Sequence, residues 1–595
     1  MVGIAMDEKT ETDAPGSTPG QFGPPWLTVE TGLYILLLLV GALLRFYALG
    51  SRPLEEAEAE LALDAWRFYS GGAASIRGHS PLLFHGNVLF YILFQAGDYA
   101  SRIAPALAGT VMIAMPYLLR SRLGRRGALL ASVFLAISPS FLFFSRQLNG
   151  DIVAAAASLA LVAGIFGYAT QRRSWQLYTV AAALAVALLA SGATFAVLLA
   201  LIGFFGATIA RSYLREKDES SPLDRLFGEK PFPDVYLPAL GVFAAVLVLL
   251  STGLLVNLHG IQATLDLLSL WLGQFQPVAG TQPWHYYLSL LAVYELPVLL
   301  FGLAGACYLI RRDPFSVFLV CWFGVSLALY TLMGTKPPAG ILQILLPLTL
   351  LAGRSAGELL SQLSSGEQWL WGKLTLVVSL PVVFHLLIQA AAFANPDDPG
   401  DPRHLALMLL SVFFFLCVVS IVGVLSLDWR TSLRSGGLVI LVVLASLTVH
   451  AAWRLNYHQP GNPFELLVER PTSTDVRNLA KAIEDLSNQR EQQRHSVKIS
   501  VIGEEDPLLA WYLRPFRELQ FVSGAGTSPS PVVITPLAET QHLPEYRGAR
   551  FRLQSSWQAA SPSGHDLINW FLFRESLQSP VHRDVVMWVA PKTEE

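Results

Sequence analysis

The sequence contains few charged residues. Asp, Glu, Lys and Arg make up only 14% of its 595 residues, whereas 53% are hydrophobic, and soluble domains carry about 25% charged residues. The net charge is −3 and no basic face stands out, so the composition gives no support for a nucleic-acid partner. These proportions predict a polytopic α-helical membrane protein.

Cysteine is also scarce. The three cysteines, Cys307, Cys321 and Cys417, lie inside apolar runs, which excludes a disulfide framework and a Cys-based metal spacing. The loop "SGAGTSPSP" at 523–531 has no helix opening after it, so it does not fit a phosphate-binding glycine motif. We therefore predict no cofactor and no protein-bound metal cluster, and we leave a divalent metal requirement open.

The N-terminus lacks the basic-then-apolar order of a cleaved signal peptide. Its first residues are polar and rich in Gly and Pro, which predicts a disordered cytoplasmic tail over residues 1–30. Beyond it, windows of about 20 apolar residues can each cross about 30 Å of hydrocarbon. We predict about thirteen spans, near 31–50, 99–119, 128–144, 151–170, 175–190, 192–210, 237–256, 285–310, 314–333, 339–357, 374–394, 404–426 and 436–454.

The arginines predict the orientation of these spans. If the first helix runs outward, the loops rich in Lys and Arg fall on the cytoplasmic side, as short cytoplasmic loops do; they contain Arg120–Arg126, Arg172–Arg173, Arg211–Lys217, Arg311–Arg312 and Arg430–Arg434. The opposite loops are acidic or nearly neutral. We therefore predict a multi-pass protein of the plasma membrane, with a transmembrane domain at 31–455 and a first extracytoplasmic loop at 51–98.

The last 140 residues differ in character. Long apolar runs end near 456. Short β-rich segments, "SVKISVIG", "LQFVSG", "PVVIT" and "VVMWVA", then alternate with helical patterns such as "DVRNLAKAIEDLSNQ". We predict an extracytoplasmic α/β domain at 456–595. This length is sufficient for the domain to bury a core of its own.

Acidic residues gather directly after the first predicted span. Residues 55–64, "EEAEAELALD", contain four glutamates and Asp64. A helix start accounts for Glu55 and Glu56, because the helix dipole favours negative side chains in the first turn. It does not account for Glu56, Glu60 and Asp64, which place like charges along one helix face. A cation, a basic partner or a proton-accepting role would account for them.

The surrounding residues resemble the GT-C superfamily of membrane glycosyltransferases, which includes protein O-mannosyltransferases and the lipid A aminoarabinose transferase. The resemblance rests on "RPL…E.E" at 52–58, on Gly97, Asp98, Arg102 and Pro105, and on "SPSFLFFSRQLNGDI" at 138–152. The stretches at 281–305 and 334–353 are similar to the prokaryotic flippase-activity-associated proteins. The resemblance implies inverting transfer of a sugar from a polyprenyl-phosphate lipid to a protein or glycan acceptor at the extracytoplasmic membrane face.

One position departs from the family. Its Asp-Glu pair would fall on Ala57 and Glu58, so only the glutamate remains. We predict that Glu58 or Glu56 accepts the acceptor's proton, which a carboxylate can do. Two alternatives stay open: a non-catalytic membrane protein that binds a lipid-linked glycan or joins an envelope complex, and, less favoured, a secondary transporter.

Further polar residues are candidates for substrate binding. Arg146, Asp151 and Lys336 could meet the lipid head group, although an interfacial ion pair or snorkelling explains them equally well. Glu295 stands near the middle of an apolar span, where carboxylates are costly and a functional or network role is the default. His79 is a further candidate, with a structural role as its alternative.

Overall fold

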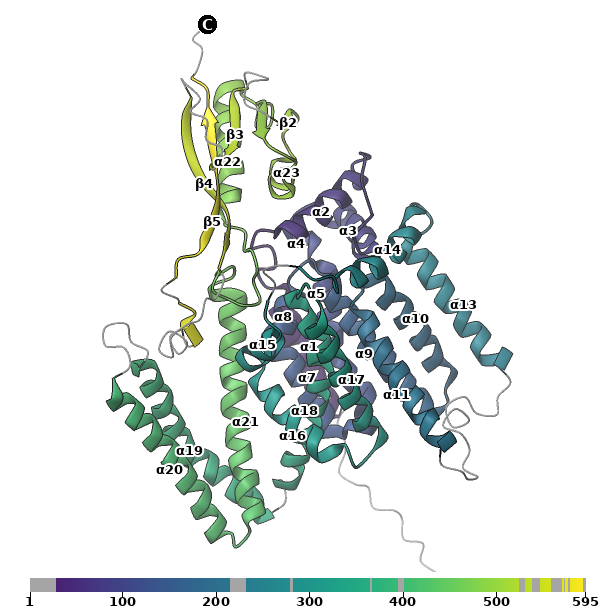
Figure 1. Ribbon diagram of the computed structural model, residues 1–595, viewed down its shortest axis with the longest axis vertical. Coiled ribbons are helices and arrows are strands. Elements are labelled where there is room, and N and C mark those ends of the chain that lie inside the picture. The colour runs from purple at the N-terminus through teal and green to yellow at the C-terminus, as the bar shows by residue number, and fades with distance from the viewer. Residues whose placement is uncertain are drawn as a thin grey trace, which may run out of the picture.

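The computed structural model describes residues 28–214, 232–278, 282–363, 366–393, 401–523, 530–537, 546–557, 570–571, 573–575 and 578–591. A helical bundle carries a smaller domain with a β-sheet near the C-terminus (Figure 1). The predicted fold class is therefore confirmed. The predicted N-terminal tail, the acidic loop at 395–404 and the glycine loop at 523–531 lie largely outside the described residues.

The chain enters the bundle with α1 (Val29–Phe46). A long connecting segment that contains three helices follows α1. This loop holds α2 (Glu56–Tyr69), α3 (Pro81–Phe94) and the short α4 (Asp98–Ser101). The chain then returns through α5 (Ile103–Ala114), η1 (Met115–Leu119), α6 (Arg120–Leu123), α7 (Arg125–Ile137), α8 (Pro139–Ser145), α9 (Gly150–Gln171), α10 (Ser174–Ala190) and α11 (Thr194–Leu214).

The second half of the bundle has the same helical character. It comprises α13 (Phe232–Ser251), α14 (His259–Gly273), α15 (Tyr286–Tyr294), α16 (Leu296–Leu309), α17 (Pro314–Leu332), η2 (Pro338–Gly340), α18 (Ile341–Leu363), α19 (Gly366–Phe393), α20 (Pro402–Leu425), α21 (Trp429–Trp453) and the single π-helical turn η3 (Arg454–His458).

Within the described residues, nine helices are long and apolar enough to cross a membrane, and eleven spans result if each of two bent pairs counts as one. The predicted count of thirteen is not confirmed. Two of the predicted spans fall on α10 and on Tyr236–Ser251, which are apolar but shorter than 18 residues. The orientation of the two termini stays a prediction.

α18 forms the centre of the bundle. It is buried over most of its length and packs against α7, α16 and α17. Small residues permit the close approach of α7: a Cβ on Gly353 would lie 2.6 Å from Ala131, and one on Gly357 would lie 2.5 Å from the backbone nitrogen of Gly127. Close contact between small residues is a common way of packing helices in membranes.

The two bent pairs have local causes. α7 and α8 meet at 58°, where Ser138 caps α8 and Pro139 opens it; α15 and α16 meet at 109° at Glu295, with Pro297 in the first turn of α16. Proline is tolerated at a helix start but interrupts a continuing helix. Each predicted single span, 128–144 and 285–310, is therefore interrupted by a sharp bend.

The C-terminal domain is a five-stranded sheet in the order β2-β1-β3-β5-β4, flanked by α22 (Asp475–Glu491) and α23 (Pro507–Leu513). β1 (Ile499–Ile502) pairs parallel with β2 (Leu519–Val522) and β3 (Val532–Pro536). β5 (Val581–Val589) pairs antiparallel with β3 and with β4 (Arg547–Ser556). The helix and the strands that the sequence predicts fall on α22, β1, β2, β3 and β5.

Asp98 holds this domain to the first loop. Its carboxylate accepts hydrogen bonds from Trp511 Nε1 (2.8 Å) and from the Tyr512 hydroxyl (2.8 Å), and it forms an ion pair with Arg477 (2.5 Å). The Tyr512 oxygen accepts the backbone N–H of Leu54 (2.8 Å). The C-terminal domain therefore fixes the start of α2, where the acidic residues lie.

Candidate functional site

Glu58 lies in a buried ion pair. Arg102 Nε donates to one carboxylate oxygen (2.9 Å) and Nη2 to the other (2.6 Å), while the backbone N–H groups of Leu148 (2.6 Å) and Glu55 (2.9 Å) add one bond each. Glu58 is 4% exposed and Arg102 is 1% exposed. Both oxygens are thus engaged by charge-assisted bonds.

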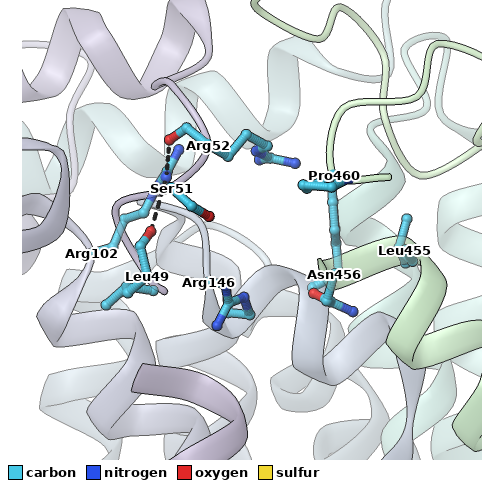
Figure 2. A pocket seen from close by; sticks show the side chains of 9 residues that line it. Leu49, Ser51, Arg52, Arg102, Arg146, Leu455, Asn456 and Pro460 are labelled. Atoms are coloured by element: carbon cyan, nitrogen blue, oxygen red, sulfur yellow. Dashed lines mark hydrogen bonds between the residues drawn. The ribbon is translucent and has the colours of Figure 1, made fainter. Parts of the chain in front are cut away.

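The electrostatics of Glu58 do not suit a proton acceptor. Burial raises the pKa of this carboxyl group, but the charge and hydrogen bonds of Arg102 outweigh that effect and hold the pKa below its usual range. Arg102 also donates to the carbonyl oxygens of Leu49 (3.3 Å), Arg52 (2.7 Å) and Pro53 (3.0 Å), and Figure 2 shows the first two bonds. The pair therefore fastens the chain between α1 and α2, and the catalytic role of Glu58 stays a prediction.

Glu55 has the opposite environment. It is the residue immediately before α2, and one carboxylate oxygen accepts from Gln147 Nε2 (3.1 Å) and lies 3.1 Å from Arg52 Nη2. Burial raises the pKa of this carboxyl group to about 7, with Arg52 acting in the opposite direction. Glu55 is therefore poised to take up a proton near neutral pH.

Glu469 faces the same region from the segment before the C-terminal domain. It interacts electrostatically with Glu55, and with Tyr286 and Tyr287 of α15. Glu469 is exposed, yet the surrounding protein partly desolvates its carboxyl group and raises its pKa. Glu55 and Glu469 thus lie within electrostatic range of each other, and the pKa of each carboxyl group is raised, which is typical of acid–base sites.

Tyr287 links Asp151 and the segment of Lys336 to the surroundings of Glu469. Asp151 accepts a hydrogen bond from the Ser191 hydroxyl and lies within electrostatic range of Tyr287. The Tyr287 hydroxyl donates to the carbonyl of Pro337 (2.9 Å), the residue after Lys336, whose Nζ donates to the carbonyl of Met333 (2.9 Å). The structure thereby brings the segments of Asp151 and Lys336 together around one tyrosine.

Arg146 caps the end of α1. Nη1 donates to the carbonyls of Leu44 (3.0 Å), Arg45 (3.2 Å) and Tyr47 (2.7 Å), Nη2 donates to that of Ala48 (3.1 Å), and the guanidinium lies over the Tyr457 ring at 4.7 Å. Burial lowers the pKa of this guanidinium to about 10. These contacts commit Arg146 to backbone capping, which accounts for it without a substrate.

A small cavity of about 20 Å³ separates Arg146 from Arg52 (Figure 2). Its lining also includes Phe143, whose ring lies 5.0 Å from the Arg52 guanidinium, and Asn456 and Pro460 from the other side. The volume suits a water molecule and not a sugar or a lipid head group.

The remaining predicted residues have separate places. His79 Nε2 lies 3.1 Å from the carboxylate of Asp64, and this hydrogen bond connects the residues before α3 to α2. Glu56 accepts from Gln554 Nε2 (3.2 Å) of the C-terminal domain. Glu295 is fully buried, and its Oε1 accepts the Ser138 hydroxyl (2.6 Å) and the Ser140 N–H (3.0 Å) at the bend between α7 and α8. Glu56 follows Glu55 in the chain, but its carboxylate bonds to the C-terminal domain, and the contacts of His79 and Glu295 are with other elements.

In the described part of the chain, no group of three His, Cys, Asp or Glu side chains has the geometry to hold a metal ion. The absence of a cofactor stays a prediction, and the requirement for a divalent metal stays open. Sequence reasoning missed Gln147, although it lies in the stretch 138–152, and it missed Glu469, which lies in no recognised motif. It noted Glu55 only as a helix-start residue, since burial, which raises its pKa, cannot be read from a single sequence.

Comparison with known proteins gives matches over the N-terminal part and over the whole fold. Residues 78–218 match the family described as dolichyl-phosphate-mannose-protein mannosyltransferase. An undecaprenyl phosphate-α-4-amino-4-deoxy-L-arabinose arabinosyl transferase of Pseudomonas fluorescens is 32% identical over 179 residues, which are 28% of this chain and 31% of that relative; one of Pseudomonas aeruginosa is 33% identical over 183 residues, 29% of this chain and 32% of that relative. The matched stretch thus spans about a third of the length of these curated relatives.

The solved structures extend the likeness to the fold. ArnT from Cupriavidus metallidurans bound to undecaprenyl phosphate superposes with a TM-score of 0.55 over 94% of this chain and 98% of that chain, at 16% sequence identity. The same protein in the apo state gives a TM-score of 0.53, with the same coverage of both chains and 14% identity. Bundle and C-terminal domain are therefore arranged alike in the two proteins.

Proposed function

From its ArnT-like fold and the family match over residues 78–218, we propose that the chain is a membrane glycosyltransferase of the GT-C superfamily, which transfers a sugar from a polyprenyl-phosphate lipid to an acceptor at the extracytoplasmic membrane face. The single observation that carries the proposal is Glu55, whose carboxyl group precedes α2, accepts a hydrogen bond from Gln147 and has a pKa raised to about 7. The arabinosyl transferases of Pseudomonas and the ArnT fold support the same donor class.

The proposed reaction is one displacement at the anomeric carbon. A hydroxyl or amine of the acceptor attacks this carbon, the bond from carbon to the phosphate oxygen breaks, and polyprenyl phosphate leaves. Attack from the face opposite the leaving group inverts the configuration of the sugar. The proton of the acceptor must go to a base during this step.

We assign the proton acceptor to Glu55. Its carboxylate is available at neutral pH because its pKa is about 7, whereas Glu58 is neutralised by Arg102. Glu55 also lies two residues before Ala57, the position at which the family's aspartate would stand. Glu55 has an extended backbone before the start of α2, and we propose that its carboxylate substitutes for the missing one.

Lys336 is our proposed cation for the leaving phosphate. An ammonium group has three N–H donors, and Met333 accepts one of them within the described residues. A cation beside the departing oxygen stabilises the charge that develops there. Arg146 is not assigned this role, because its guanidinium caps α1.

Sugar transfer in reconstituted vesicles tests the proposal. The purified chain is combined with polyprenyl-phosphate-linked sugars, including 4-amino-4-deoxy-L-arabinose and mannose, and with lipid or peptide acceptors. Release of free polyprenyl phosphate that depends on the acceptor is the expected result, with Lys336→Ala slower and Arg403→Ala unchanged. Binding of a donor without turnover, under any of these combinations, would instead favour a non-catalytic component that binds lipid-linked glycans.

A further inference from the structure

Two arginines near the end of α1 have no acidic partner in the described part of the chain. Arg45 is fully buried, and its guanidinium donates to Ser145 Oγ (3.3 Å) and to two backbone carbonyls (3.1 and 3.2 Å). Arg146, also buried, donates only to backbone carbonyls. The groups that act electrostatically on these two arginines are Tyr457 and other arginines. Burial of a charge without a counter-charge is costly.

Two further arginines lie close to this pair. Arg102 is neutralised by Glu58, and Arg52 lies 3.1 Å from Glu55. Both Arg102 and Arg52 act electrostatically on Arg146. Four guanidinium groups thus share two carboxylates, which leaves an excess of two positive charges even when Glu55 is ionised.

The other acids near these groups do not balance that excess. Glu469 acts on Glu55, but Arg470 acts on Glu469. Asp98 acts on Arg102, but it forms its own ion pair with Arg477. Each of these carboxylates therefore already has a cation beside it.

Spare N–H donors line the small cavity between Arg52 and Arg146 (Figure 2). Arg52 Nη2 is buried and makes no hydrogen bond, because the Glu55 oxygen beside it lies outside hydrogen-bond geometry. A guanidinium has five N–H groups, and in the described residues the Nε–H and one Nη2–H of Arg146 have no acceptor. Asn456 Nδ2 donates one hydrogen to the carbonyl of Ala452 (2.9 Å) and carries a second.

The cavity has room for one small ion. Its volume of about 20 Å³ holds one water molecule, and a chloride ion is only slightly larger. A phosphate group with its ester chain does not fit. A larger cavity of about 450 Å³ shares Ser51, Arg52 and Pro460 with the small one and extends to the exposed Arg552 of β4, so an ion can enter from solvent.

We propose that this cavity binds one chloride ion, held by the N–H groups of Arg52, Arg146 and Asn456. The ion supplies part of the negative charge that the four arginines lack, and its contacts with the two guanidinium groups are charge-assisted. It joins the chain after α1 to η3, because Asn456 lies on the opposite side of the cavity from Arg52. This site is separate from Lys336, the cation proposed for the leaving phosphate.

Thermal unfolding of the purified full-length chain in detergent tests the inference. Sodium chloride is compared with sodium gluconate at equal ionic strength, because both salts screen charges alike and gluconate is too large for the cavity. The unfolding temperature should rise with chloride concentration and not with gluconate, since a ligand that binds only the folded state stabilises it by mass action. Equal unfolding temperatures in the two salts would overturn the inference.

Three variants separate this site from general salt effects. Arg52→Gln should weaken chloride binding about tenfold or more, the loss expected for one charge-assisted bond. Asn456→Leu keeps every charge but removes a donor, so it should also weaken binding, and it serves if Arg52→Gln does not fold. Arg403→Gln is the matched control, since Arg403 is an exposed arginine at the start of α20 that does not line the cavity. A folded Arg52→Gln or Asn456→Leu chain that responds to chloride as the native chain does would contradict the proposal.

Polyprenyl phosphate is the other anion to be tested. Saturating chloride should leave the dissociation constant of polyprenyl phosphate unchanged, because the two anions occupy different places. Competition between them would overturn the inference, since the cavity would then hold the phosphate of the donor. The unfolding measurement does not depend on sugar transfer, so the chloride site and the proposed function stand or fall separately.

Discussion

At the scale of single residues, the acids after α1 divide into different tasks. Glu58 neutralises Arg102, Glu56 bonds to the C-terminal domain, Asp64 pairs with His79, and Glu55 remains beside Glu469 with a raised pKa. Their sequence spacing suggested one acidic helix face. Glu56, Glu60 and Asp64 share one face of α2, whereas Glu58 points to Arg102 and Glu55 precedes the helix, because residues two apart on a helix differ by about 200°.

Glu58→Gln should destabilise the chain. The substitution leaves the Arg102 guanidinium buried without its counter-charge, and loss of one partner of a buried pair costs about 3–5 kcal/mol. Thermal unfolding in detergent should therefore begin at a clearly lower temperature, whereas Glu60→Gln, at an exposed position of α2, should leave it unchanged. An unfolding temperature equal to that of the native chain would contradict the structural role of Glu58.

The pH dependence of this contribution has a definite sign. The pKa of Glu58 is lower in the folded chain than in the unfolded chain, so the ion pair stabilises the fold above the unfolded pKa of about 4.3 and this stabilisation is lost as pH falls below it.

Ala57→Asp tests whether Glu55 replaces the family's aspartate. In the native background the added carboxylate should change transfer little, because Glu55 already accepts the proton. In Glu55→Gln it should restore part of the lost rate, measured as sugar transferred per minute in vesicles. Ala57→Asn is the matched control, since it adds the same bulk without a base. No restoration by Ala57→Asp would argue against a shared proton-accepting position.

At the scale of elements, sequence periodicity predicted the apolar helices well and their interruptions poorly. The spans 128–144 and 285–310 read as continuous because every residue around the breaks except Glu295 is compatible with a membrane helix. Pro139 and Pro297 mark the bends, but proline also occurs within α18 and α19, which continue through it. Contacts with neighbouring helices determine whether a helix bends or continues at each proline.

Glu295 joins the two bends to each other. It stands at the break between α15 and α16 and accepts hydrogen bonds from Ser138 and Ser140 at the break between α7 and α8. Glu295→Gln and Ser138→Ala should each lower the unfolding temperature. The double variant should lose less than the sum of the two, because each single change already removes the shared bond. Strictly additive losses would mean that the two bends are independent.

At the scale of the whole molecule, the sequence predicted the bundle and most of the C-terminal sheet. β4 (Arg547–Ser556) was missed because its charged, Gly-containing sequence "RGARFRLQSS" lacks the usual alternation. The site could be predicted only in part: a single sequence places Glu55 near the first span, but it cannot bring Glu469 beside it across about 400 residues of chain.

Orientation is testable on the intact cell. Cysteine at the exposed position Gln520, in β2, should react with an impermeant thiol reagent added outside, while cysteine at the exposed position Arg125, at the start of α7, should react only after lysis. The native Cys307, Cys321 and Cys417 are replaced by alanine for this measurement. Labelling of the Arg125→Cys variant in intact cells would contradict the proposed topology, because position 125 would then lie outside.

The central claim is that Glu55 accepts a proton during sugar transfer, and the pH profile of single-turnover transfer measures it most directly. The native chain should gain activity as pH rises through about 7, where the carboxylate forms. Glu55→Gln should be slower by about 10²–10⁴-fold and should lose that rise, with donor binding retained. A Glu55→Gln chain that transfers sugar at the native rate, with the same pH profile, would contradict the account.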